Sequence, residues 1–213
     1  MKKLALIMAG ILTIGTFGCT AFAGAEESVA ESTESVAEPV EVNWSDIEPS
    51  VKELGIEGDF VTFDEIALKM WMPTVLAPTE LTDEDKENGY IGYFQTEDES
   101  AAVAVVYVDV NGATLEEYQT LLAEDETVSE LETCSLNGLN ALSYKIEDTD
   151  SASVAFDTEK GYILEVTFAP ISDEGFEQVA SIITASIQPE ETADAEAADS
   201  EAADSEAADS EAA

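Results

Sequence analysis

Residues 130–146 read ELETCSLNGLNALSYKI, and this stretch decides the class of fold. Two strand-like runs, Glu130 to Ser135 and Leu139 to Ile146, flank the pair Asn137-Gly138. An Asn-Gly pair between two such runs favours a tight two-residue turn, because both residues tolerate a positive φ. The stretch therefore predicts an antiparallel β-hairpin.

Further strand signals lie on both sides of this hairpin. Apolar residues alternate from Ile66 to Met72 and stop at Pro73, which has no N–H to donate to a sheet. Both faces of the run Ala101 to Val110 are apolar, which is typical of a central strand covered on two sides. Other strands are expected at 89–96, 151–156 and 162–169, with an acidic turn at 97–100 and a second turn at 159–161.

Helix signals follow each group of strands. Thr114-Leu-Glu-Glu117 matches a capping box, and the apolar residues after Thr114 that fall on one helical face are Leu115, Tyr118, Leu121 and Leu122. Ser172 is expected to cap a final helix that Pro189 closes, and a short helix is expected over 46–54. The predicted class is α+β: a mostly antiparallel sheet with helices on both faces.

The domain organisation follows from changes in composition. Residues 1–23 are expected to be a signal peptide, 24–43 a disordered acidic linker, 44–189 one folded domain, and 190–213 a disordered acidic tail. The tail contains three copies of the unit EAADS, beginning at Glu196. Such a unit cannot form a core, so we interpret the tail as low-complexity sequence.

The N-terminal sequence is typical of a segment that directs export. Lys2 and Lys3 precede an uncharged, mostly apolar run, and two processing sites then compete. Cleavage after Ala23 fits an A-x-A site and is favoured, whereas lipidation of Cys19 fits a lipoprotein box less well. Either route predicts an extracytoplasmic protein, secreted or attached to the cell surface, that meets the membrane only through its signal segment or a lipid on Cys19. Cleavage would leave Cys134 as a lone cysteine, which we interpret as a small buried hydrophobe.

Composition excludes several chemistries. The 213 residues carry 48 acids and seven lysines, no His and no Arg, for a net charge of −41. Without His there is no imidazole base or His-ligated zinc, and without a basic surface nucleic acid is not an expected partner. Six acids lie in 24–43 and ten in 190–213, which leaves 32 acids and five lysines in the domain, a net charge of −27.

No residue of the domain is assigned a catalytic, cofactor or metal role, and no cofactor is expected. Residues 83–89 are rich in acids, but Asn88 stands where an EF-hand needs its glycine and Phe94 where it needs its final glutamate. The acidic residues 147–150 are interpreted as a solvated turn. Trp71 is either an exposed aromatic for a partner or, as we favour, part of the core, and Trp44 is expected to pack at the entry of the domain.

The arrangement resembles the PsbP-like fold family. The resemblance rests on the strand that ends at Pro73, the capped Thr114–Glu117 helix, the segment from Leu136 to Tyr144 and the closing helix near Ile182 to Ile187, and it covers roughly residues 58–188. It implies an α/β/α sandwich and transfers no functional residue, since proteins of one fold can have different functions. Members that dock on photosynthetic membranes use basic residues, from which this acidic chain departs.

We therefore expect an exported, non-enzymatic binding or accessory module of the cell envelope or extracellular space, with an unidentified protein or envelope component as partner. One alternative is a small carboxylate-dependent hydrolase, which would need two acids of different pKa in a cleft. The other is an acidic surface protein that binds calcium and other divalent cations weakly.

Overall fold

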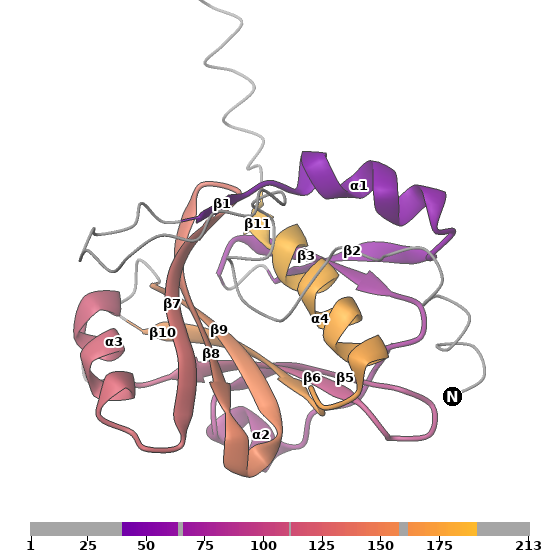
Figure 1. The fold of residues 1–213 in the computed structure, drawn as a ribbon. Coiled ribbons are helices and arrows are strands. Elements are labelled where there is room, and N and C mark those ends of the chain that lie inside the picture. The colour runs from indigo at the N-terminus through magenta and orange to yellow at the C-terminus, as the bar shows by residue number, and fades with distance from the viewer. Residues whose placement is uncertain (1–39, 64–65, 111, 158–161, 191–213) are drawn as a thin grey trace, which may run out of the picture.

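The computed structural model describes residues 40–63, 66–110, 112–157 and 162–190 (Figure 1). The predicted signal peptide with Ala23 and Cys19, most of the linker, the turn at 159–161 and the EAADS tail lie outside these residues. Among the described residues no helix is long and apolar enough to cross a membrane.

Eight strands form the main sheet, in the order β1-β7-β8-β9-β10-β6-β5-β4. Neighbouring strands are antiparallel except β1 and β7, which run parallel. The bounds are β1 Val40–Val42, β4 Ala77–Pro78, β5 Tyr90–Gln95, β6 Ala102–Val108, β7 Val128–Leu136, β8 Leu139–Ile146, β9 Ser151–Asp157 and β10 Ile163–Ala169. The mixed α+β class and the antiparallel character of the sheet are confirmed.

A second, three-stranded sheet has the order β11-β3-β2, with bounds β2 Gly58–Phe63, β3 Leu68–Pro73 and β11 Gln188–Pro189. The prediction of a single sheet that includes the strand ending at Pro73 is wrong, because β3 belongs to this second sheet. The physical reason is that β3 pairs on one side with β2 and on the other with β11, so both of its edges are occupied.

Four α-helices and a 3₁₀ turn complete the domain: α1 Trp44–Glu53, α2 Asp83–Glu87, α3 Leu115–Ala123, α4 Glu174–Ser186 and η3 Glu147–Thr149. The predicted capping box is confirmed, because the Glu117 N–H donates to Thr114 Oγ1 and the Glu117 carboxylate accepts from the Thr114 N–H. Leu121, expected on the packed face of α3, is instead 55% exposed.

The final helix begins one residue later than expected. Its N-cap is Asp173, whose Oδ1 accepts a hydrogen bond of 3.0 Å from the Phe176 N–H. Ser172 is not the cap, because its N–H donates 2.9 Å to Asp150 Oδ1 and its hydroxyl donates to Oδ2 of the same carboxylate. The serine therefore ties the start of α4 to the end of η3.

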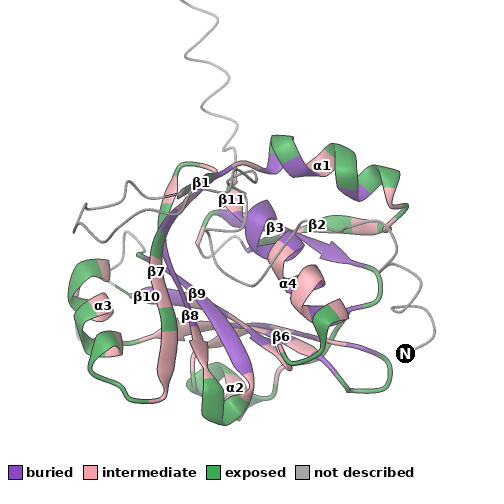
Figure 2. Cartoon of the chain, viewed as in Figure 1, coloured by how far each residue is buried: buried purple, intermediate pink, exposed green. Residues whose placement is uncertain are grey.

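The core lies on both faces of the main sheet, and Figure 2 shows buried residues along its central strands. The larger cluster fills the space between that sheet, α1, α4 and the three-stranded sheet, whereas a smaller cluster packs under α3. On β6, Val103 and Val105 face the larger cluster and are fully buried, but Ala102, Ala104 and Val106 are only half-buried. The strand is thus fully covered on one face and partly on the other, which corrects the expectation of complete cover.

The folded domain begins at Val40 rather than at residue 44. Val40–Val42 form β1 and pair with Cys134 to Leu136 of β7, so the prediction that they belong to the linker is wrong. Their short apolar pattern, VEV, gains its partner only from the distant hairpin, so no local signal marked it. α1 then starts at the buried Trp44 and runs to Glu53, which extends the expected helix at its N-terminal end.

The Asn-Gly turn does more than join β7 to β8. Asn137 and Gly138 have φ values of 48° and 84°, as the predicted tight turn requires. Asn137 Nδ2 donates to the carbonyls of Ala185 and Ile187 at 2.9 and 2.7 Å, and its Oδ1 accepts 2.6 Å from the Trp44 N–H. This side chain therefore connects the hairpin to the beginning of α1 and the end of α4.

Candidate functional site

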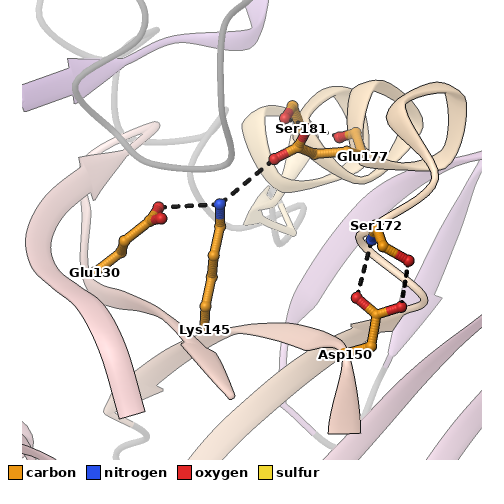
Figure 3. Close-up of polar contacts among 6 residues, drawn as sticks. All are labelled: Glu130, Lys145, Asp150, Ser172, Glu177 and Ser181. Atoms are coloured by element: carbon orange, nitrogen blue, oxygen red, sulfur yellow. Dashed lines mark hydrogen bonds and ion pairs between the residues drawn. The ribbon is translucent and has the colours of Figure 1, made fainter. Parts of the chain in front are cut away.

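Lys145 lies at the centre of a charged cluster between the main sheet and α4 (Figure 3). Its Nζ lies 3.0 Å from Glu130 Oε2 on β7 and 3.5 Å from Glu177 Oε1 on α4. The lysine side chain is only 15% exposed, whereas Glu130 is half exposed. An ion pair at this depth is retained only when its geometry compensates the loss of water, and here the two pairs hold three elements together.

A β-bulge shapes this cluster. The β7–β8 register shifts between Ser129 and Glu132, and Glu130 within the bulge has a positive φ of 51°. Beyond the bulge Glu132 pairs with Ser143, two residues from Lys145 and therefore on the same face of β8. Glu132 Oε2 is buried and has no hydrogen-bond partner. Among the described residues, the face toward α4 thus brings Glu130, Glu132 and Glu177 together with Lys145.

A second polar cluster lies on the opposite face of the sheet. The hydroxyls of Tyr118 on α3 and Tyr144 on β8 both donate to Glu165 Oε1 on β10. Burial, followed by the negative charge of Glu165, raises the pKa of both tyrosines above the ordinary value of 10.0. The phenols therefore remain protonated hydrogen-bond donors at neutral pH, and they fasten α3 to the sheet.

The two tryptophans meet beside β2. Trp71 is 6% exposed and stacks on Trp44 with ring centroids 5.9 Å apart. The hypothesis of an exposed Trp71 that binds a partner is therefore wrong, and the core interpretation is confirmed, as is the packing of Trp44 at the domain entry. The exposed aromatic of this group is Phe60, 40% exposed, which meets Trp44 edge to face and lies under Lys69.

The two acidic segments considered for calcium are local structures. Residues 83–87 form α2, in which Thr82 and Asp85 make a reciprocal capping box, and the pKa of Asp85 is lowered by its hydrogen bonds from Thr82. Residues 147–150 form η3 and a left-handed residue, Asp150, that binds Ser172. Over the described ranges there is no group of three or more His, Cys, Asp or Glu that could hold a metal ion.

Cys134 is buried in β7, as the sequence predicted, with 2% of its surface exposed. Its sulfur is disulfide-bonded rather than a free thiol. A lone cysteine is expected only once cleavage after Ala23 has removed Cys19, and this stays a prediction for the mature chain.

The outer edge of β2 is the feature that sequence reasoning missed. Each sheet ends in two edge strands, and three of these four are only two or three residues long. β2 is six residues long and contains neither proline nor lysine. Short strands, prolines and lysines are the usual protection of a sheet edge, and among the four described edge strands β2 alone has none of these. Its GDFVTF sequence has no strict alternation that could have revealed it.

No protein-family model matches the chain, and no curated protein is similar to it. Among solved structures, the chain is similar in fold to cyanobacterial PsbP (CyanoP) from Synechocystis sp. PCC 6803. The likeness has 8% sequence identity and a TM-score of 0.44, and it covers 63% of this chain and 93% of that chain. At this identity the likeness concerns the fold alone and transfers no site residue.

Proposed function

We propose that the chain is an exported, PsbP-like accessory module that binds another component of the cell envelope or extracellular space and catalyses no reaction. The observation that carries this proposal is that the partly buried charged side chains of the domain connect its helices to its sheet. Lys145 joins β7, β8 and α4, and Glu165 joins α3, β8 and β10. These groups fasten helices to the sheet, which is a structural task.

The surface supports binding. Most acids of the domain are exposed, and its net charge of −27 creates a field that attracts cationic partners and repels anionic surfaces. The unprotected β2 edge and the exposed Phe60 add a place for specific contact. We propose export on the basis of the N-terminal signal pattern ahead of Ala23.

The test combines localisation with capture. The tagged full-length gene product would be expressed in its native host, and its intact mass measured in the envelope and culture fractions. A mature mass beginning at residue 24, or at a lipidated Cys19, together with a reproducible cross-linked partner, supports the proposal. A chain that keeps residues 1–23 in the cytoplasm, or one that turns over glycan substrates, would contradict it.

A further inference from the structure

We infer that the edge of β2 is a docking site for an extended, basic segment of a partner protein, which would add to the three-stranded sheet as a fourth strand. This inference deepens the proposed binding function and rests on it. Addition of a strand to an open sheet edge is a common mode of peptide recognition, in which backbone hydrogen bonds give affinity and alternate side chains give specificity.

The direction of the backbone groups can be worked out from the register. The Thr74 N–H donates 2.9 Å to the Glu57 carbonyl, so residues 57, 59, 61 and 63 direct their backbone groups toward β3. Phe60 lies opposite Trp71, and the Trp71 N–H donates 2.8 Å to Ser186 Oγ on the far side of β3. Both observations show which residues of β2 face away from β3: Gly58, Phe60 and Thr62 direct their N–H and C=O groups outward.

These outward groups are open within the described domain. Outside the β2–β3 pair, no hydrogen bond joins the backbone of Gly58, Phe60 or Thr62 to another described residue. The outer backbone groups of β3, by contrast, are bonded to β11 and to Ser186. Asp59, Phe60 and Thr62 are all exposed, and Figure 2 shows the outer strand β2 in exposed and intermediate colours beside the buried β3. A fourth strand could therefore bond at three successive outward positions.

Charge selects the occupant. Glu57 and Asp59 lie at the start of this edge and Lys69 lies over Phe60, while residues 44–189 together carry a net charge of −27. Opposite charges on adjacent strands stabilise a pair and like charges destabilise it, so the added strand should carry Lys or Arg. A second copy of the chain would bring two such acidic domains together and is disfavoured. The exposed Phe60 ring further favours a segment with an apolar residue at the position beside it.

The test is an NMR titration of the ¹⁵N-labelled mature chain, tail included, at physiological salt. The probe is a peptide of alternating lysine and valine, and its control is the same peptide with proline at every second lysine, which cannot form a ladder. Binding of the first peptide should give its largest shift changes at the amides of residues 58–62 and slow the hydrogen exchange of Phe60 and Thr62.

Matched variants sharpen the test. Thr62→Pro removes an outward N–H and leaves the hydrogen bonds between β2 and β3 intact. It should weaken peptide binding by roughly tenfold or more, because one hydrogen bond to the added strand is lost and the pyrrolidine ring obstructs another. Asp59→Asn should weaken peptide binding and reduce the dependence of the affinity on salt. Glu124→Gln makes the same charge change at the exposed C-terminal end of α3 and should leave both quantities unchanged. Circular dichroism and the dispersion of the remaining amide signals check that each variant folds.

The outcomes separate the two proposals. Shift changes spread over the whole acidic surface, or equal losses for Asp59→Asn and Glu124→Gln, would overturn the docking site in favour of diffuse attraction. Concentration-dependent dimerisation through β2 without peptide would overturn it in favour of a second copy. If Thr62→Pro captures the native partner as well as the unchanged chain does, the binding function stands and the β2 site fails. If the peptide binds at β2 but no envelope partner is found, the site stands and the accessory function fails.

Discussion

Replacing Asn137 by aspartate tests whether the Asn-Gly turn holds the two helices. Asn137→Asp keeps the Oδ1 acceptor for the Trp44 N–H and the tolerance for positive φ, but it replaces the amide group that donates to Ala185 and Ile187. A carboxylate would then face two carbonyl oxygens at the former donor distances of 2.9 and 2.7 Å. The substitution therefore converts two attractive interactions into repulsive ones while leaving the turn geometry possible.

The magnitude follows from the two hydrogen bonds that the substitution removes. Each hydrogen bond contributes about 1 kcal/mol net, and leaving a partly buried group against like partial charges costs about 1–3 kcal/mol more. We expect the free energy of unfolding to fall by about 3 kcal/mol, which for a domain of this size lowers the melting temperature by about 6–12 °C. Asn140→Asp is the matched control: Asn140 is exposed on β8, and its substitution should change stability by less than about 0.5 kcal/mol.

The assay is urea unfolding followed by tryptophan fluorescence, since Trp44 and Trp71 stack where α1 meets β3. Repeating it at lower pH adds a second criterion. The repulsion raises the folded-state pKa of the introduced aspartate, so the deficit should be greatest at neutral pH and shrink as the pH falls through that pKa and the acid becomes a donor again. Equal stabilities of Asn137→Asp and Asn140→Asp at pH 7 would refute the account of the turn as the anchor of both helices.

Four further results are expected. Lys145→Met should lower the free energy of unfolding by about 1–3 kcal/mol in thermal melts at neutral pH, because it removes the ammonium group that lies between Glu130 and Glu177; no loss of stability would contradict the structural role of the cluster. In a spectrophotometric alkaline titration, Tyr118 and Tyr144 should ionise after the ordinary tyrosines, and the stability they confer should be complete below pH 10.0 and decline as the pH rises beyond it toward their raised pKa values. Carboxyl-detected NMR should place the pKa of Asp98 at about 2, because its carboxylate accepts hydrogen bonds from Ser100 and Thr96, so the turn should remain ordered until the pH falls through that value; a pKa near 3.8 would contradict the turn geometry. Sodium chloride should raise the melting temperature by screening the net charge of −27, and millimolar calcium at matched ionic strength should add no further rise, whereas a specific calcium shift would indicate a dedicated site.

The parts of the fold that the sequence predicted correctly are those with local signals. The Asn137-Gly138 turn, the Thr114 capping box and the apolar spacing of α4 each depend on residues within a few positions of one another. Such signals depend on backbone preferences and hydrogen bonds inside one element. These local structures therefore form independently of how distant parts of the chain pack.

The parts that the sequence did not predict depend on distant partners. The split into two sheets requires β3 to pair with β2 and β11, and β11 lies more than one hundred residues beyond β3 in the chain. Tyr118, Tyr144 and Glu165 come from three separate elements, and nothing in their local sequences indicates that their polar groups meet. The N-cap of α4 is Asp173 instead of the predicted Ser172 for the same reason, because Ser172 hydrogen-bonds to the distant residue Asp150.

The candidate binding edge was hidden by its composition. Strand signals depend on alternating apolar residues, and β2 is largely exposed, so its Asp59 and Thr62 interrupt any such pattern. An edge strand is defined by the absence of a neighbour, which no single stretch of sequence records. The inventory of acids and the absence of arginine and histidine, by contrast, could be read in full and already argued against nucleic acid as a partner.

Site-specific photo-cross-linking in the native envelope tests the central claim most directly. A photoreactive amino acid would replace Thr62 on the β2 edge or, as a control, Leu121 on the exposed face of α3. We predict that position 62 cross-links to a Lys- or Arg-rich segment of a partner, identified by mass spectrometry, and that position 121 does not. Equal cross-linking from both positions, or a position 62 that reacts only with other copies of this chain, would contradict the account.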